Sequence, residues 1–531
     1  MALSKLDLLQ TTVGQLLATR AKEIPDRVYI RFEDKAITYG EFDRMVNQVA
    51  NRLLAAGIRK GDRVGLFLDN SIEYCLLFWA IARVGAVMVP MNTGYPADEL
   101  RYAVNHSEQI LLFAHDHLRS VVEECRDQCT SLKEVVYVGG PEPNFETWLH
   151  GSTDTPVEVD VSPRDLLGVY YTSGTTARPK GVMLCHNSYV LGADFWCSAF
   201  ECKEEDTLYG FFTLFHANNG IYLQVGAVLN GCTFAFRRGF SVREHWDLVQ
   251  KFDATVFNSA GGISSMLAAQ PPSEKDKAHR VRAVVNGINM GAEAKKAFED
   301  RFGVVLLDAY SLTECLTGTI ERLADVPKRT FERLKTIGRP SEWVEMKIVD
   351  DDGNELPPGE KGEICFKGPA VMLGYLNNPE ETAKALKDGW LYTGDVGYVD
   401  GDGYLYYSDR KKDMIKHKGE NVASAEVERV LCSHPSVQEA AVIGVPDPFV
   451  DEEIKAYIIL KPGEKEDPWA LIEHCRKYLE EFKVPRFIEF RDSFPRPTAV
   501  PKILKAALRA EKADLREGCF DRGPSKGGKK R

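Results

Sequence analysis

Short, continuously apolar segments alternate with amphipathic segments in the first part of the chain, and this alternation constrains the fold most strongly. "VGLFL" (64–68), "AVMVPM" (86–91) and "ILLFA" (110–114) have the length and composition of strands buried on both faces. Between them the sequence predicts a helix that opens near Asn70–Ser71 and a shorter one that opens at Pro96. Such strands joined by helices form parallel sheets covered on both faces. We therefore predict an α/β fold with doubly wound sheets.

The same alternation begins earlier and continues later in the chain. "VYIRF" (28–32) and "AITYG" (36–40) flank a turn, and Thr38 and Glu41 have capping-box spacing ahead of an apolar-periodic helix that stops at Gly57. The sequence therefore predicts two strands and then a helix in this region. Further strands of the same pattern are predicted at 233–238, 254–258 and 304–310.

The length of 531 residues exceeds what one hydrophobic core usually supports, so at least two domains are expected. Beyond Thr336 the strands become shorter, and "MKIVDDDGNELPPGEKGEICFKG" (346–368) predicts a hairpin-rich, barrel-like β part. After Asp409-Arg410 follows a compact α+β stretch with helices predicted at Ser424–Cys432 and Pro468–Glu481. The predicted domains are 1–409, a smaller one at 410–513, and a basic, disordered tail at 514–531.

Charge and apolar runs exclude several classes of function. The net charge of −11 argues against a general nucleic-acid or anionic-membrane surface. The start of the chain lacks a charged-then-apolar signal segment. The most apolar run, Tyr74–Met91, carries Arg83 and Gly85, and predicts a buried helix followed by a buried strand instead of a membrane span. We expect no membrane insertion and a cytoplasmic location.

Cysteine spacing and the end of the chain add two expectations. The twelve cysteines are scattered, and only Cys125 and Cys129 are close in sequence, which disfavours a zinc site or a disulfide scaffold and suits a reducing compartment. The glycine-rich, basic end (516–531) is predicted to be a solvated tail. A nucleic-acid contact by this tail is the alternative.

The stretch "YYTSGTTARPKG" (170–181) has the composition of a phosphate-binding loop. It departs from the pattern G-x-x-x-x-G-K-[ST], because Pro179 stands at the second glycine and Gly181 follows Lys180. Hydroxyl donors and close backbone approach to an anion are offered by Ser173, Gly174, Thr175 and Thr176. The loop suits a pyrophosphate grip without a Mg-binding residue beside the lysine. The alternative is a surface turn.

Four further motifs follow in order: "DAYSLTE" (308–314), "GWLYTGD" (389–395), "DRKKDMIKHKGENV" (409–422) and "PRPTAVPK" (495–502). Together with the hydroxyl-rich loop they resemble the motif series of the acyl-adenylate-forming superfamily of acyl-CoA synthetases, luciferases and nonribosomal adenylation domains, over essentially residues 10–510. Within it, segments 270–290 and 301–310 look most like crotonobetaine/carnitine–CoA ligases.

The resemblance implies a two-step reaction. A carboxylic acid and ATP would give acyl-AMP and pyrophosphate, and the acyl group would then pass to coenzyme A. The implied cofactors are ATP, Mg²⁺ and coenzyme A, and the partner is a small carboxylic acid with no nucleic acid; homodimers are common in relatives. Bringing a carboxylate toward a polyanion requires cations at the point of attack, where one unit-charge pair at about 4 Å is worth roughly 4 kcal/mol.

Two residues resemble the family's catalytic groups outside the phosphate loop. Lys502 matches the mobile lysine that reaches the carboxylate and α-phosphate, although Pro501 precedes it and one extra residue separates it from Pro495. Lys505 is the rival; Lys502 is preferred because "KILKAALR" then keeps the position of the second basic residue. His216 in "FTLFHANNG" resembles the residue between acyl pocket and thiol tunnel, with Thr213 where the family has proline. A satisfied, half-buried histidine is its alternative.

The remaining motif positions imply contacts to the nucleotide and its metal. Glu314 would be a Mg²⁺ ligand, with Thr175 as the second metal position, and Thr313 would contact the α-phosphate. Tyr310 would stack on adenine, although it could equally be core. Ser311 replaces a common glycine.

Asp395 would accept hydrogen bonds from both ribose hydroxyls, with Arg410 near the same sugar and Lys412 at the hinge of the small domain. The segment after this hinge would turn inward along the pantetheine arm. The full set implied for ATP and coenzyme A is Thr172, Ser173, Gly174, Thr175, Thr176, Lys180, Asp308, Ala309, Tyr310, Ser311, Asp395, Arg410, Lys412, Lys418, Gly419 and Glu420.

The acyl pocket is the least specified part of the site. Its implied lining residues are Trp196, Tyr222, Gly261, Gly262 and Gly287. A trimethylammonium substrate would need aromatic faces or a carboxylate there. Aromatic residues that could supply faces, or equally be core, are Phe195, Trp196, Phe215 and Tyr222. Betaine-type, medium-chain and cyclic or aromatic acids therefore stay open.

Two other functions compete with an acid–CoA ligase. The basic tail and the altered "VPK" (500–502) keep open a stand-alone adenylating enzyme that transfers to a carrier protein or an amine. The departures Ala177, Ser311 and Pro501 motivate a catalytically silent binding protein of the same fold. Intact candidate residues count against this last alternative: Lys180, Glu314, Asp395, Arg410 and Lys502.

Overall fold

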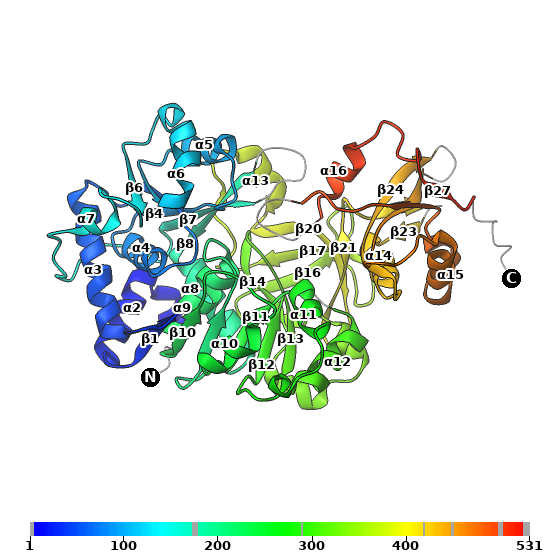
Figure 1. The fold of residues 1–531 in the computed structure, drawn as a ribbon, viewed down its shortest axis with the longest axis horizontal. Helices are drawn as coiled ribbons and strands as arrows, with labels where there is room; N and C mark the ends of the chain where they lie inside the picture. Colours follow the sequence, from blue (N-terminus) through cyan, green and yellow to red (C-terminus); the bar gives the residue numbers. More distant parts are fainter. Residues whose placement is uncertain are drawn as a thin grey trace.

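The computed structural model describes residues 5–172, 179–287, 290–417, 420–447, 451–496 and 503–523. Its strands form four sheets, and Figure 1 shows the last of these, with its helices, set to one side of the rest. The helices before residue 400 are α1 (Lys5–Gln10), α2 (Val13–Glu23), α3 (Tyr39–Ala55), α4 (Ile72–Arg83), α5 (Ala97–His106), α6 (Arg119–Cys125), α7 (Phe145–Leu149), α8 (His186–Ala199), α9 (Gln224–Asn230), α10 (His245–Lys251), α11 (Gly261–Ala268), α12 (Ala292–Phe302) and α13 (Pro379–Ala385).

The first sheet has seven strands and contains the predicted parallel core. Its order is β18 (Gly374–Tyr375), β8 (Lys180–Cys185), β7 (Leu166–Thr172), β4 (Val87–Pro90), β3 (Arg63–Phe67), β5 (Leu111–His115) and β6 (Glu134–Val138). The strands from β7 to β6 pair in parallel, whereas β8 and β18 add antiparallel strands at one edge. The predicted α/β alternation between residues 64 and 114 is therefore confirmed.

The second sheet has nine strands. Its order is β15 (Arg339–Pro340), β14 (Cys315–Ile320), β13 (Val305–Leu312), β12 (Ala283–Asn286), β11 (Val256–Ser259), β9 (Thr207–Gly210), β10 (Thr233–Phe236), β1 (Val28–Phe32) and β2 (Lys35–Thr38). The first two strands of the chain therefore join a sheet formed mostly by residues after 200. Glu33, with φ 55°, turns β1 back into the antiparallel β2, and β2 ends at Thr38 because that residue caps α3.

The local signals for α3 and α4 explain these helices. The Thr38 hydroxyl accepts from the Glu41 N–H, the Glu41 carboxylate accepts from the Thr38 N–H, and Gly57 adopts φ 87° after the helix. In α4 every residue except Glu73 is buried, which accounts for its apolar composition. Arg83 at its end pairs with Asp43 of α3 at 2.6 Å. None of the helices in the described part of the chain combines the length and apolarity needed to cross a bilayer.

The predicted barrel-like part is a five-stranded antiparallel sheet that is open at β16. It contains β16 (Glu345–Val349), β17 (Gly362–Lys367), β20 (Trp390–Val399), β19 (Leu386–Lys387) and β21 (Leu405–Arg410), with β21 paired to β20. In Figure 1 this sheet lies between the large sheets and the small C-terminal part.

The fourth sheet and three helices form the C-terminal part. Its elements are β22 (Ile415–His417), β23 (Glu420–Val422), β24 (Val437–Asp447), β25 (Asp451–Leu460), β26 (Phe487–Phe490), β27 (Phe520–Asp521), α14 (Ser424–Cys432), α15 (Pro468–Tyr478) and α16 (Lys505–Ala510). Helix α14 has the predicted bounds, whereas α15 ends at Tyr478, before the predicted Glu481. Its last residue precedes the 3₁₀ turn Glu481–Lys483.

The prediction that the chain is disordered from residue 514 is wrong for its described residues. Phe520–Asp521 form β27, which pairs antiparallel with β26. The Arg522 guanidinium donates to the carbonyls of Pro485 and Val484 at 2.8 and 2.9 Å. A basic residue in this segment therefore anchors it, and the remainder of the tail lies outside the described residues.

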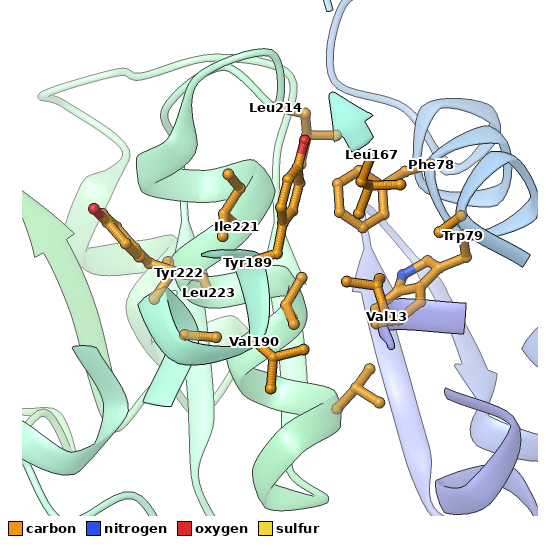
Figure 2. Packing of buried hydrophobic residues seen from close by; sticks show 14 of the residues in the cluster. Val13, Phe78, Trp79, Leu167, Tyr189, Val190, Leu214, Ile221, Tyr222 and Leu223 are labelled. Carbon is orange, nitrogen blue, oxygen red and sulfur yellow. The ribbon is translucent and has the colours of Figure 1, made fainter. Parts of the chain in front are cut away.

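The buried hydrophobic side chains of the described residues form five clusters: three lie at or before Leu405, the largest of them called the large core here, and two lie at or after Ile415. Figure 2 shows part of the large core, where side chains of α2, α4, β7 and α8, among them Val13, Trp79, Leu167 and Tyr189, face one another. Helix α8 thus contacts both the first sheet and the second. The break between the cores is consistent with the domain boundary at 409–410, which stays a prediction.

Candidate functional site

A hairpin places a carboxylate and a guanidinium side by side. Asp395 of β20 and Arg410 of β21 are register partners, and Arg410 Nε lies 3.5 Å from Asp395 Oδ1. The Tyr310 hydroxyl, from β13, donates to the other carboxylate oxygen, Oδ2, at 2.7 Å. Burial and the nearby Asp395 carboxylate raise the pKa of Tyr310, so the phenol stays protonated and acts as a donor.

A hollow of about 380 Å³ opens beside this pair. It is lined by Thr393, Gly394, Asp395, Arg410, Lys411 and Lys412. Gly394 adopts φ 71°, and its carbonyl accepts from the Lys411 N–H at 2.8 Å, which holds the two strands together at this point. One carboxylate next to several cations suits a ligand with both hydroxyl and phosphate groups.

Lys412 at this hollow is the predicted hinge residue. Its side chain is exposed, and desolvation together with the neighbouring Arg410 lowers the pKa of its ammonium group. Arg509 of α16 pairs with the adjacent Asp413 at 2.9 Å, so α16 contacts the chain immediately after the hinge.

A larger hollow of about 440 Å³ lies elsewhere, along β14 and the 3₁₀ turns that follow it. Three of its four arginines are already paired with carboxylates: Arg339 with Asp325 at 2.9 Å, Arg329 with Glu299 at 2.6 Å, and Arg333 with Asp402. We place the candidate site at the smaller hollow because it contains the motif residues Asp395 and Arg410 and adjoins Tyr310.

The β13–β14 hairpin carries a second cluster four residues beyond Tyr310. Thr313 and Glu314 form its turn, and both are half-buried. The Tyr375 hydroxyl donates to Glu314 Oε1 at 2.9 Å. Ala309 is buried in β13. One hairpin therefore presents Tyr310 to the Asp395 carboxylate and Glu314 to a separate polar cluster.

Lys180 belongs to this second cluster. It pairs with Thr172 across the β7–β8 hairpin, and its ammonium forms an ion pair with Glu381 of α13. Its Nζ lies 4.8 Å from the ring centroid of Tyr375. Lys180 and Lys384 hold the pKa of the Glu381 carboxyl down to about 2. The predicted loop residues Ser173, Gly174, Thr175 and Thr176 lie outside the described residues, as does Ala177.

The structure places the side chain of Asp308, which is predicted to contact the nucleotide, in the protein interior, and the contact itself stays a prediction. Its carboxylate is fully buried and accepts from Lys295 Nζ at 2.7 Å and from Asn286 Nδ2 at 2.8 Å. Its backbone N–H donates to Glu321 Oε2, and its carbonyl accepts from the Glu321 N–H. Asp308 thus belongs to a buried hydrogen-bonded network and lies two residues before Tyr310 in the chain.

Sequence reasoning missed Lys295, which also forms an ion pair with Glu321. Burial raises the pKa of both the Asp308 and Glu321 carboxyls, and the Lys295 ammonium opposes that rise. The helical period did contain a signal, because Lys295 shares the buried face of α12 with Ala292, Phe298 and Phe302. A lysine on an apolar stripe needs a buried partner.

Lys295→Met is expected to lower the free energy of unfolding by about 3–5 kcal/mol, because it leaves buried carboxylates without their cation. Chemical denaturation followed by circular dichroism measures this. The neighbouring Lys296→Met is the control: Lys296 and its partner Asp300 are exposed, so a change within about 0.5 kcal/mol is expected. Equal effects of the two variants would contradict a structural role for the buried network.

The aromatic residues predicted for the acyl pocket pack on each other. The rings of Trp196 and Tyr222 stack with centroids 4.3 Å apart and an interplanar angle of 3°. Trp196 Nε1 donates to Asn258 Oδ1 at 2.8 Å, and the Tyr222 hydroxyl donates to the Leu316 carbonyl at 3.1 Å and lies 2.9 Å from Ser311 Oγ. Both rings are buried, as in the core alternative, and Tyr222 appears at the edge of the cluster in Figure 2.

Open space lies at the predicted glycines of the pocket. A Cβ at Gly262 would meet no atom within 4 Å, and one at Gly287 would meet only the Ser259 carbonyl, at 4.0 Å. Gly261 begins α11. Both Gly262 and Gly287 are exposed, so the open space beside them, at α11 and the end of β12, faces solvent.

His216 reaches solvent although it sits deep among protein atoms. The Asn218 N–H donates to its Nδ1 at 3.1 Å, so the neutral ring carries its proton on Nε2. Desolvation lowers the pKa of the imidazole, which favours this neutral form.

In the C-terminal part the structure ties Lys505, the rival lysine, to a local network. Its Nζ pairs with Glu428 at 2.7 Å and donates to Ser424 Oγ at 2.6 Å. Asp409, at the end of β21, accepts from the Ser424 hydroxyl and from the Ala425 N–H, and so caps α14. Glu420 is exposed in β23. Lys418, Gly419 and Lys502 lie outside the described residues.

Comparison with known proteins follows this geometry. Residues 17–376 match the family model described as "AMP-binding enzyme", and residues 426–502 match "AMP-binding enzyme C-terminal domain". The chain is 35% identical over 488 residues to a crotonobetaine/carnitine–CoA ligase of Salmonella paratyphi B, covering 90% of this chain and 93% of the relative. It is also 35% identical to the ligase of that name from Escherichia coli O7:K1, over 89% and 93% of the two chains.

Solved structures give the same picture. The chain superposes on the anthranilate CoA ligase AuaEII in complex with anthranoyl-AMP with a TM-score of 0.87, 28% identity, and 95% and 97% of the two chains covered. The fatty acyl CoA synthetase of Mycobacterium tuberculosis gives a TM-score of 0.74, 29% identity, and 94% and 98% coverage. The likeness spans both the large and the small part of the fold.

Proposed function

The chain belongs to the family of AMP-binding enzymes, and from this premise we propose that it is an AMP-forming acid–CoA ligase. It would activate a carboxylic acid with ATP to acyl-AMP and pyrophosphate, and then transfer the acyl group to coenzyme A with release of AMP. The observation that carries this proposal is the β13–β14 hairpin, which places Tyr310 on the Asp395 carboxylate and Glu314 beside Tyr375 and Lys180. The β13–β14 hairpin thus carries both a residue next to the proposed ribose site and a residue of the proposed phosphate site.

In this proposal Asp395 accepts hydrogen bonds from the ribose hydroxyls, with Arg410 beside the same sugar. The Tyr310 hydroxyl is held by Asp395, which lines the hollow, and its ring would stack on adenine. Lys180 would exchange its Glu381 partner for a phosphate oxygen, which is also an anionic acceptor. Thr313, half-buried in the hairpin turn, would donate to the α-phosphate.

Glu314 fits the role of a Mg²⁺ ligand. Among the described residues, a hydrogen bond is made to its Oε1 from Tyr375, and Oε2 has no such partner, so one hard carboxylate oxygen is available. Bound Mg²⁺ would neutralise phosphate charge. Thr175 is the second proposed metal contact.

The proposed domains are 1–409 and a mobile 410–513 with Lys412 as hinge. Lys502 would bring its charge to the carboxylate and α-phosphate, and rotation about Lys412 would then remove it before the thiol attacks. Lys418, Gly419 and Glu420 would line the path of the pantetheine arm, and His216, neutral with its proton on Nε2, would lie at its inner end. A cytoplasmic location and a homodimer are part of this proposal.

The acid is the open part of the function. The relatives' names make crotonobetaine and carnitine the first acids to test. The stacked Trp196–Tyr222 pair is buried, so a trimethylammonium group would have to meet another face of the pocket. The open side at Gly262 and Gly287 has room for a bulkier or cyclic acid.

A panel of betaine-type, medium-chain and aromatic acids tests the function, with pyrophosphate, AMP and acyl-CoA measured with and without coenzyme A. We expect at least one acid to give AMP and acyl-CoA in equal amounts, dependent on coenzyme A. Acid-dependent pyrophosphate release with transfer only to an amine or carrier protein would instead assign the stand-alone adenylating function. Release of neither product with any acid would support the silent binding protein.

A further inference from the structure

The segment 374–385, which comprises β18 and α13 and is called the clasp below, lies against the strand that carries Lys180. Gly374 and Tyr375 pair antiparallel with Met183 and Val182 of β8. The Leu376 N–H donates to the Gly181 carbonyl at 2.8 Å, which extends this pairing. The Met372 N–H, just before the clasp, donates to the Glu314 carbonyl at 2.8 Å. Backbone hydrogen bonds thus join the clasp to both motif segments.

The sequence of the clasp explains why the chain folds back sharply from β18 into α13. Asn378 caps α13 by accepting from the Glu381 N–H at 3.1 Å, and Pro379 occupies the first helical turn. The Thr382 hydroxyl accepts from the Tyr375 N–H at 2.9 Å. Gly374 has φ 137°, and a Cβ there would meet the Thr382 side chain at 2.9 Å. These contacts fix Tyr375 relative to α13 and its Glu381.

Tyr375 makes two chemically different contacts with the candidate site. Its hydroxyl donates to Glu314 Oε1 at 2.9 Å, and its ring faces Lys180 Nζ at 4.8 Å from the centroid. Tyr375 is 9% exposed, whereas the side chain of Lys180 is 32% exposed. Burial, reinforced by the Glu314 carboxylate, raises the pKa of the phenol, which stays a donor at neutral pH.

We propose that Tyr375 is a positioning residue for adenylate formation: its hydroxyl orients Glu314, and its ring holds the Lys180 ammonium. This inference rests on the proposed function, in which Glu314 holds a divalent cation and Lys180 meets phosphate. The Tyr375 hydroxyl donates to Oε1 of Glu314 and thereby fixes the direction in which Oε2 points. The ring attracts the ammonium without using any of its three N–H donors, which stay available to Glu381 or to phosphate.

The two contacts can be separated by two substitutions. Tyr375→Phe keeps the ring over Lys180 and removes only the hydroxyl, whereas Tyr375→Leu removes both contacts. Tyr398→Phe serves as the matched control, because Tyr398 is a half-buried tyrosine that stacks on Tyr406 and, among the described residues, forms no hydrogen bond or cation–ring contact with Glu314 or Lys180. Thermal unfolding of each variant shows whether it is folded. Tyr375→Phe nearly keeps the volume of the side chain, so the test of the hydroxyl does not depend on whether the leucine variant folds.

Metal binding is measured by titrating Mn²⁺ into the protein–ATP complex and following free Mn²⁺ by electron paramagnetic resonance. Tyr375→Phe is expected to raise the apparent dissociation constant for Mn²⁺ about tenfold, which corresponds to one hydrogen bond to a charged group. ATP affinity in a chelator, from calorimetry, should change less than about twofold in Tyr375→Phe and weaken about three- to tenfold in Tyr375→Leu. Tyr398→Phe should match the wild type in both.

An unchanged Mn²⁺ constant in folded Tyr375→Phe would overturn the inference. Equal ATP affinity in the phenylalanine and leucine variants would overturn the role of the ring. Failure of the proposed function has a different signature, because the wild type itself would then bind no ATP or support no acid-dependent pyrophosphate exchange. A half-saturating Mg²⁺ concentration that shifts more in Tyr375→Phe than KM for the acid does would support positioning.

Discussion

Lys502→Ala should lose acid-dependent exchange of pyrophosphate into ATP by a factor on the order of 10²–10³, the usual cost of removing one charge or donor aimed at developing charge. In the proposed reaction this lysine meets the substrate carboxylate and α-phosphate only when the small domain closes. ATP affinity, measured by calorimetry, should therefore change far less than the exchange rate. Exchange of labelled pyrophosphate at saturating ATP gives the comparison.

Lys505→Ala is the matched control for this prediction. Lys505 pairs with Glu428 and donates to Ser424, whose hydroxyl also bonds the Asp409 carboxylate. Removing it leaves Glu428, whose side chain is largely buried, without its cation, so thermal stability should fall while the exchange rate per folded molecule stays within a few-fold of wild type. If Lys505→Ala alone abolished exchange in a folded protein, the catalytic lysine would be Lys505.

Asp395→Ala is expected to weaken ATP binding by about 10²–10⁴-fold, because two hydrogen bonds between ribose hydroxyls and a carboxylate would be lost, each worth about 1.5–3 kcal/mol. The substitution would also leave the Tyr310 hydroxyl and Arg410 without their shared acceptor. Calorimetric titration with ATP measures the loss. Asp351→Ala, which removes an exposed partner of Lys411, should bind ATP within about twofold of wild type.

The ligand itself supplies a second control for Asp395. Wild type should bind 2′,3′-dideoxy-ATP much more weakly than ATP, whereas Asp395→Ala should bind the two nucleotides with nearly equal affinity. Such a cycle isolates the contact between carboxylate and ribose from any general damage. An undiminished preference for ATP in Asp395→Ala would show that another group reads the sugar.

Much of the fold follows from local patterns in the sequence. The capping box at Thr38, the cap at Ser71 and the apolar strands between residues 64 and 114 specify α3, α4 and the parallel part of the first sheet. Pairing over long distances does not follow from such signals. Strands β1 and β2 join β10 in the second sheet, about two hundred residues later in the chain, because sheet membership is decided by packing of complete layers.

The candidate site, too, follows only in part from local patterns in the sequence. The motifs identify Tyr310, Glu314, Asp395 and Arg410, and the structure brings Tyr310, Asp395 and Arg410 together. Asp308 lies two residues before Tyr310 in the same strand, so strand alternation does not separate the two side chains; the pairing of Asp308 with the buried Lys295 of α12 distinguishes them, and the motif does not reveal it. Tyr375 and Glu381 have no charge pattern that marks them, because their role arises only where the clasp meets β8 and the β13–β14 hairpin.

In the proposed function, the contacts of Lys180 with Glu381 and Tyr375 would hold its side chain in place before ATP binds. Lys180 is neutralised by Glu381 and covered by Tyr375, so its charge is satisfied by the protein itself. An incoming polyphosphate must therefore compete with one carboxylate, which favours ligands with higher negative charge than a single phosphate. The ion pair with Glu381 and the ring of Tyr375 together explain how the Lys180 side chain can keep its orientation without a bound ligand.

The most direct test of adenylation is exchange of labelled pyrophosphate into ATP by the wild-type protein, with each acid of the panel and no coenzyme A. The account predicts exchange that requires both the acid and a divalent cation, together with a bound species of the mass of the acyl-AMP. Cleavage of ATP to ADP and phosphate, or ATP binding with no exchange for any acid, would contradict it.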